Sequence, residues 1–199
     1  MAFEPNFDLL KELCESPGVS GREEVIRGMV ARHLRDFCED VHTDTMGNVI
    51  GTKKGKGNKR ILIAGHMDEI GLVVTKLEKG YLRFSTVGGF DLRVLLGQEV
   101  VVHGRRDLPG IIGTRPPHVL SPEEREQVVP LDRLFIDVGL TEAELGANVR
   151  VGDIVTLRRE FTELAGGLVA GKAFDDRAAV ACIDLCLQYL AGLKHTWDV

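Results

Sequence analysis

Residues 61–71 have the sequence Ile61-Leu62-Ile63-Ala64-Gly65-His66-Met67-Asp68-Glu69-Ile70-Gly71. The apolar run at its start is short and ends at a glycine, which predicts a buried β-strand over Ile61–Ala64. His66 and Asp68 follow directly after this strand. Residues two apart in an extended backbone project to the same side, so we expect both side chains to face one cleft at the strand's end.

The pair formed by His66 and Asp68 has two interpretations. A metal-binding histidine generally donates its other ring nitrogen to a carboxylate, which fixes the ring and its tautomer, and Asp68 is placed to accept that bond. Alternatively, the strand runs into a polar turn and His66 is an inert, hydrogen-bonded side chain. Short motifs produce false positives, so this motif alone leaves both interpretations open.

A second pair of carboxylates, Asp175 and Asp176, precedes a helix predicted over residues 177–192. A helix N-terminus favours anions, which is a sufficient explanation for Asp176. Asp175 follows the apolar residues Ala173 and Phe174, so we expect it to point inward. A carboxylate directed into a cleft needs a partner, and a metal ion is one such partner.

The composition limits the classes of partner. The chain has 199 residues and a formal net charge of -5, which gives no electrostatic argument for nucleic acid or an anionic membrane as partner. No apolar run approaches the length of a membrane span. Met1–Pro5 has neither a basic region nor an apolar core, so we expect no signal peptide and a reduced, cytoplasmic protein. Cys182 and Cys186 are expected to pack as small hydrophobic residues on the predicted helix.

The N-terminal part of the chain predicts helices and short strands. Asn6 is placed to cap a first helix. Ser20-Gly21-Arg22-Glu23 has the capping-box pattern and is expected to open a second, amphipathic helix. Short strands are predicted over Val41–Asp44 and Asn48–Thr52, and with the buried strand they indicate an α/β layer.

The middle of the chain has a different sequence pattern. Six short segments rich in β-branched residues predict strands at 72–77, 81–87, 99–103, 108–113, 134–138 and 154–157, with two short helices opened by capping boxes at Ser121 and Thr141. Short strands without long helices between them predict a small β-barrel or sandwich. We therefore expect a β domain over residues 72–165, inserted into an α/β domain made of residues 1–71 and 166–199.

Several motifs together resemble the M42 family of metal-dependent aminopeptidases, which includes glutamyl aminopeptidases and proteins labelled cellulase M. They fall in the family's order along essentially the whole chain: Pro17-Gly18-Val19-Ser20-Gly21, Asp44-Thr45-Met46-Gly47-Asn48, Ala64–Gly71, Val87-Gly88-Gly89, Gly113–His118 and Gly171–Arg177. The resemblance implies a three-layer zinc-peptidase α/β domain with an inserted β-barrel that mediates dimerisation. Dimers of the family often build dodecamers.

The resemblance also assigns roles. His66 would bind one of two divalent metal ions, zinc or cobalt, and Asp175 would bridge both. Asp68 would orient the histidine and is the candidate catalytic residue, while Asp176 would support Asp175 through an unusual Asp-Asp peptide linkage. The implied activity is hydrolysis of N-terminal residues from peptides, a metalloprotease reaction.

One departure limits the implied activity. In the family, the strand after the predicted helix carries a Glu-Glu pair that provides the general base and a metal ligand, and further ligands follow. These residues would lie beyond Val199, so we expect a truncated active site, weak metal binding and little or no hydrolysis by this polypeptide alone.

Two other functions compete with this interpretation. The chain could be a catalytically inactive association module that acts through its β domain, since such a module needs none of the missing carboxylates. Glycoside hydrolysis would require two carboxyl groups facing one sugar cleft, and the combination of histidine with a bridging aspartate favours metal chemistry instead.

Overall fold

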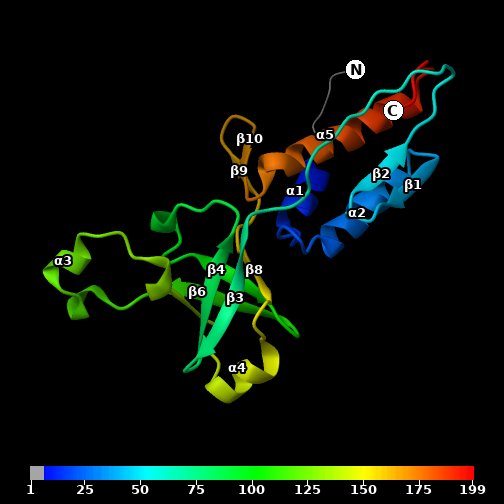
Figure 1. The fold of residues 1–199 in the computed structure, drawn as a ribbon. Coiled ribbons are helices and arrows are strands. Elements are labelled where there is room, and N and C mark those ends of the chain that lie inside the picture. The colour runs from blue at the N-terminus through cyan, green and yellow to red at the C-terminus, as the bar shows by residue number, and fades with distance from the viewer. Residues whose placement is uncertain (1–6) are drawn as a thin grey trace. The chain divides into compact units, whose positions relative to one another are not determined.

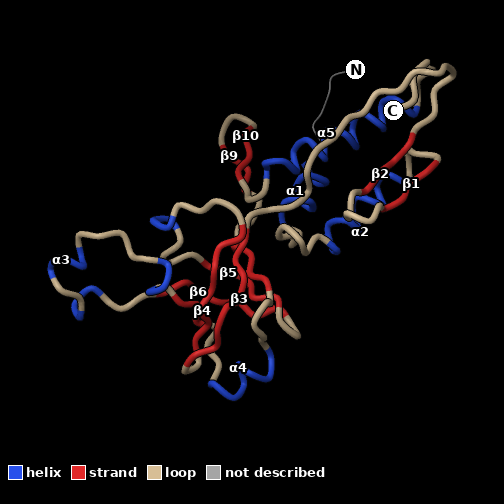
Figure 2. Tube along the Cα trace, viewed as in Figure 1, coloured by secondary structure: helices blue, strands red, loops and turns tan. Residues whose placement is uncertain are grey.

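The structure is a computed structural model that describes residues 7–199. The chain forms two compact units: Ile70–Arg159 is one, and the described residues up to Glu69 together with Glu160–Val199 are the other. Figures 1 and 2 show their elements. The expectations for Met1–Pro5 and for the Asn6 cap fall outside the described residues. No helix in residues 7–199 has the length and apolar character needed to cross a membrane.

The middle unit is a closed barrel with the strand order β3-β4-β7-β6-β5-β8. Its antiparallel strands are β3 (Gly71–Glu78), β4 (Tyr81–Val87), β5 (Glu99–His103), β6 (Asp107–Gly113), β7 (Phe135–Asp137) and β8 (Ile154–Leu157). The six predicted strands are therefore confirmed. Of the two predicted architectures, barrel and sandwich, the structure is the barrel. β3 pairs with β8 at Leu72 and Val155, which closes the structure.

Alternate side chains of the barrel strands point inward, as a pleated strand requires. They form one core that includes Leu72, Leu82, Val100, Ile112 and Ile136, each at most 1% exposed.

Short helices cover or extend the barrel: η1 (Leu92–Val94), η2 (Pro117–Val119), α3 (Pro122–Arg125), η3 (Leu131–Arg133) and α4 (Glu142–Asn148). Both predicted capping boxes are formed, with Ser121 paired to Glu124 and Thr141 paired to Glu144.

The other unit combines helices with short strand pairs. Its elements are α1 (Phe7–Glu15), α2 (Glu24–Arg35), β1 (Asp40–Thr43), β2 (Val49–Thr52), β9 (Thr162–Leu164), β10 (Leu168–Ala170) and α5 (Phe174–Ala191). β1 pairs with β2 and β9 with β10, both antiparallel. Leu9, Leu13, Ile26, Met29 and Val180 join α1, α2 and α5 in one core. The predicted class, an α/β chain with a small β-barrel, is confirmed.

The buried strand predicted over Ile61–Ala64 is wrong. The segment is extended in Figure 2 but belongs to no sheet, and Ile61, Leu62 and Ile63 are 46%, 88% and 44% exposed. A strand is buried by neighbours on both sides. Within residues 7–199, no strand lies beside Ile61–Ala64 to bury it.

Two further local expectations are wrong. Glu23, not Ser20, is the N-cap of α2, and it makes no side-chain capping bond. The Ser20 hydroxyl donates to Asp68 instead, so a tertiary contact replaces the local one. Cys182 and Cys186 are exposed on α5 because they lie on the side of the helix away from Val180 and Leu187, which are buried.

Candidate active site

His66 lies between two carboxylates in the α/β unit. Its Nδ1 is 3.0 Å from Asp68 Oδ1, and its Nε2 is 3.2 Å from Asp175 Oδ1. The segment before Ile70 supplies His66 and Asp68, whereas the start of α5 supplies Asp175, 109 residues away in sequence. The structure thus brings together three of the four residues singled out from the sequence, and the fourth, Asp176, follows Asp175 in the chain.

The exposure of these side chains increases from Asp68 to Asp175. Asp68 is 34% exposed, His66 is 56% exposed and Asp175 is 97% exposed. Asp175 therefore does not point inward, contrary to the expectation drawn from the apolar residues before it.

Hydrogen bonds set the charge of the inner pair. Burial opposes ionisation of Asp68, but the Ser20 hydroxyl and His66 together lower its pKa below the usual value. Burial alone would lower the pKa of His66, but the bonds and charges of Asp175 and Asp68 raise it overall. An ionised Asp68 accepts Nδ1–H of His66 and fixes that proton on Nδ1.

In this tautomer, Nε2 of His66 faces an unusual partner. With Nδ1–H directed at Asp68, the neutral ring presents a lone pair on Nε2, and Asp175 Oδ1 is also an acceptor. Two acceptors 3.2 Å apart repel unless a proton or another cation lies between them. The arrangement therefore suits a second proton on His66 or a metal ion bound by both groups.

The start of α5 is not a regular helix. Asp175 and Asp176 have non-helical φ/ψ values, and the peptide bond between them is cis. The chain passes close by at Gly65, where an added Cβ would lie 3.3 Å from Asp176 Oδ2 and 3.1 Å from Ala179 Cβ. Glycine at this position lets the segment with His66 approach the first turn of α5.

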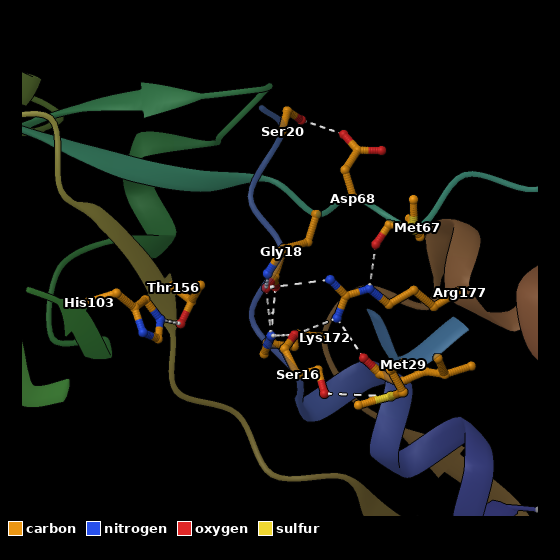
Figure 3. Close-up of polar contacts among 12 residues, drawn as sticks. Ser16, Gly18, Ser20, Met29, Met67, Asp68, His103, Thr156, Lys172 and Arg177 are labelled. Carbon is orange, nitrogen blue, oxygen red and sulfur yellow. Dashed lines mark hydrogen bonds and ion pairs between the residues drawn. The ribbon is translucent and has the colours of Figure 1, made fainter. Parts of the chain in front are cut away.

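A buried cluster of charges holds the surrounding backbone. Arg177 is fully buried, with Nε donating to Met67 O at 2.8 Å and Nη1 donating to the carbonyls of Leu13 and Ser16, both at 2.6 Å (Figure 3). Its Nη2 is 3.7 Å from Glu69 Oε1. Arg177 thus ties the end of α1, the backbone between His66 and Asp68, and the start of α5 to one another.

Lys172 and Glu69 complete this cluster. Lys172 Nζ donates to Glu69 Oε2 at 2.7 Å and to Oε1 at 2.9 Å, and Gly18 N donates to Oε1 at 3.2 Å. Burial lowers the pKa of Lys172, an effect that the Glu69 carboxylate opposes. A buried charge of either sign needs a partner, and these groups provide it for each other.

Sequence reasoning missed the supporting residues Ser20, Glu69, Lys172 and Arg177. Their types and positions were visible, since Lys172 and Arg177 flank the two aspartates and Glu69 follows Asp68. Two basic residues around a candidate acidic site were the only available indication, because nothing in the sequence shows that they are buried.

The donors present fit a divalent metal only in part. An imidazole nitrogen and a carboxylate are suitable ligands for zinc or cobalt, and Asp68 gives His66 the orienting carboxylate that such ligands carry. Within residues 7–199, however, no group of three or more histidine, cysteine, aspartate or glutamate side chains is arranged to hold a metal. A catalytic zinc usually has about three protein ligands, and residues 7–199 bring two together here, His66 and Asp175.

Comparison with known proteins gives a consistent result. A family model described as M42 glutamyl aminopeptidase matches residues 47–199. The lysyl aminopeptidase of Pyrococcus furiosus is 36% identical over 201 residues, which cover 98% of this chain and 57% of that protein. This chain spans about half the length of the curated relatives it matches.

Solved structures agree with this match. The TET aminopeptidase of Thaumarchaeota archaeon SCGC AB-539-E09 superposes with a TM-score of 0.92 at 36% identity, covering 98% of this chain and 57% of that one. A TET1 peptidase of Pyrococcus horikoshii, described as assembling into a tetrahedron or a large octahedral shell, has a TM-score of 0.86 at 37% identity, with 97% and 58% covered.

Proposed function

Because this chain belongs to the M42 glutamyl aminopeptidase family, we propose that it contributes the His66 side of the active site of a metal-dependent aminopeptidase. The reaction is hydrolysis of the N-terminal residue from a peptide. The observation that carries the proposal is the position of His66 between Asp68 and Asp175, with two acceptor atoms facing each other across 3.2 Å. A cation between them removes their repulsion.

In this proposal each residue has a defined task. His66 and Asp175 would hold one divalent ion, zinc or cobalt, and the second carboxylate oxygen of Asp175 is free to reach another. Such ions supply Lewis-acid chemistry at the peptide carbonyl. Asp68 keeps the Nδ1 proton of His66 in place, so Nε2 is always the ligand atom. Asp176 and Gly65 fix the approach of α5, and Arg177 holds the backbone carbonyl between His66 and Asp68.

The test separates metal binding from catalysis. Zinc and cobalt affinities are measured by competition with a chromophoric chelator for the wild-type chain, for His66→Ala and for His42→Ala, which removes an exposed histidine of β1 outside the site. We expect loss of binding only in His66→Ala. Equal affinity in all three proteins would refute the assignment of His66.

Catalysis is then measured on leucyl-, lysyl- and glutamyl-anilides with the metal-loaded chain. The two ligands within residues 7–199 predict weak metal binding and low turnover. Turnover that persists in His66→Ala would contradict the proposed role of this site in the reaction.

We propose that the chain also self-associates through the β-barrel. Large apolar side chains of this unit are exposed, among them Tyr81 (41%), Val94 (55%), Leu96 (47%) and Ile111 (48%). Light scattering after size-exclusion chromatography tests this: we expect a dimer or a larger assembly such as a dodecamer, and monomers for Ile111→Asp. A monomeric wild-type chain would refute it. If the chain assembles but neither binds metal nor hydrolyses peptides, the function as an association module is favoured.

We further propose a cytoplasmic location. All four cysteines are free thiols, as expected in a reducing compartment. Cell fractionation followed by thiol titration of the recovered protein tests this, and an oxidised protein outside the cytoplasm would contradict it.

A further inference from the structure

The segment Pro17-Gly18-Val19-Ser20-Gly21 is a motif of the sequence that the proposed function does not use. Its serine does not cap the following helix, because Glu23 takes that position. The Ser20 hydroxyl donates instead to Asp68 Oδ2, whereas His66 contacts the other oxygen, Oδ1 (Figure 3). This segment therefore reaches the carboxylate that orients His66.

Backbone hydrogen bonds fix the segment beside Glu69. Glu69 N donates to Gly18 O at 2.8 Å, and Ser20 N donates to Glu69 O at 3.3 Å. These two bonds form a parallel bridge at Val19, which is 0% exposed. Asp68 directly precedes Glu69, so the register of this bridge brings the Ser20 side chain to Asp68.

The side chain of Glu69 adds a third bond to the same segment. Its Oε1 accepts from Gly18 N at 3.2 Å. The carboxylate is 4% exposed and is held in turn by Lys172 Nζ, at 2.7 and 2.9 Å. Hydrogen bonds to charged groups are stronger than those between neutral groups, so Glu69 restricts the movement of residues 18–20.

Glycine at position 18 is needed for the close packing of this segment. A Cβ on Gly18 would lie 2.7 Å from Arg177 Nη2 and 2.8 Å from Ile26 Cγ2. Both of these neighbours are 0% exposed, so neither can move aside without displacing other atoms. A side chain at this position would therefore displace the segment from Glu69, and Ser20 with it.

We propose that residues 18–20, held by Glu69, form a positioning element for Asp68. The Ser20 hydroxyl holds one carboxylate oxygen and leaves the other directed at His66 Nδ1, 3.0 Å away. The proton of the neutral imidazole then stays on Nδ1, and Nε2 keeps its lone pair. Ser20 and Glu69 are positioning residues, since they act on His66 through Asp68. The consequence for metal binding rests on the proposed function, whereas the place of the ring proton does not.

The test locates the ring proton of His66 in the metal-free chain. Nitrogen–proton correlation spectra of protein with isotope-labelled histidine show which ring nitrogen carries the proton. The spectra are recorded at a pH where the ring is neutral, and His66→Ala identifies the signals. In the wild-type chain we expect the proton on Nδ1.

Two matched pairs of variants test the segment. Ser20→Ala removes the hydroxyl at an exposed position, and Ser20→Thr retains it. Gly18→Ala introduces the contacts with Arg177 and Ile26, whereas Gly28→Ala adds the same methyl group in α2, where it meets nothing within 4 Å. We expect the ratio of Nδ1–H to Nε2–H to fall roughly tenfold in Ser20→Ala and Gly18→Ala, and to stay unchanged in Ser20→Thr and Gly28→Ala.

An unchanged ratio in Ser20→Ala, or in a folded Gly18→Ala, would overturn the proposal. An equal loss in Gly28→Ala or in Ser20→Thr would overturn it as well, because either result would mean that the unit loosens as a whole. If Gly18→Ala does not fold, the two variants of Ser20 decide the question.

The proposed function can fail separately from the positioning element. If the ratio changes as expected but zinc affinity is the same with and without His66, the positioning element is supported and the metal site is wrong. If zinc binding requires His66 but Ser20→Ala leaves the proton on Nδ1, the metal site is supported and the positioning element is wrong.

Discussion

The buried arginine at the start of α5 allows a quantitative prediction. Arg177→Met keeps most of the aliphatic volume and removes the guanidinium, which is 0% exposed and bonds to three backbone carbonyls. Ser16 O keeps a bond from Lys172 Nζ at 3.4 Å, so the carbonyls of Leu13 and Met67 are the two that lose their donor. An unsatisfied buried acceptor costs about 1–3 kcal/mol, so two of them amount to about 2–6 kcal/mol. Lys172 still neutralises Glu69 at 2.7 Å, so we add nothing for that carboxylate. We expect a loss of at least about 2 kcal/mol in the free energy of unfolding of the α/β unit.

The assay is urea unfolding followed by hydrogen exchange resolved by peptide, because the two units need not unfold together. Amides of α1, α2 and α5 should lose protection in Arg177→Met, while those of β3–β8 keep it. Arg32→Met, which removes an exposed arginine of α2, is the control and should change stability by less than about 0.5 kcal/mol.

A loss below about 1 kcal/mol in Arg177→Met would contradict this prediction, since it would mean that water or a shifted backbone satisfies the carbonyls of Leu13 and Met67. Equal loss of protection in the barrel would show that the two units unfold together.

Three other predictions concern single groups. Ser20→Ala removes the donor to Asp68 and should weaken zinc binding by roughly tenfold in chelator competition, whereas unchanged affinity would show that Ser20 does not position Asp68. Burial raises the pKa of Cys14 to about 11, so iodoacetamide should label Cys186 quickly and Cys14 only after unfolding, as read by peptide mass spectrometry. The hydrogen bonds of the α4 capping box lower the pKa of Glu144 below its usual 4.5, so this stabilisation is complete above that pH and lost as pH falls through the lower folded value. Carboxylate NMR titration of Glu144 checks this, and an unshifted midpoint would contradict it.

The barrel could be predicted from sequence because its determinants are local. β4 spans Tyr81–Val87 as expected, since alternation and the turn at Lys79 and Gly80 define both of its ends. The capping boxes at Ser121 and Thr141 were likewise predictable, because each involves residues three apart.

The expectations that failed depended on distant neighbours. The same capping pattern at Ser20 does not form, because Asp68, 48 residues away, takes its hydroxyl. Ile61–Ala64 has the composition of a central strand, but burial of a strand depends on the strands beside it. Arg177 was missed for the same reason, as its partners Leu13 and Ser16 are 164 and 161 residues away.

The candidate site itself was predicted from residue types and from resemblance to a family. The sequence identified His66, Asp68, Asp175 and Asp176, and His66 lies within 3.2 Å of both Asp68 and Asp175 in the structure. The exposure of Asp175 was not predictable, because it depends on the non-helical turn at the start of α5.

The pairing of β3 with β8 has a consequence for the order of folding. The barrel is continuous in sequence, whereas the α/β unit is divided by it, and Leu72 opposite Val155 holds the two ends of the barrel segment side by side. Closing a flexible loop of 90 residues costs about 4 kcal/mol in chain entropy by the logarithmic rule. A barrel that folds before the α/β unit removes this cost from the assembly of that unit. Residues 160–199 can then join residues 7–69 at a lower cost in chain entropy, and Arg177 can bond to the carbonyls of Leu13 and Ser16.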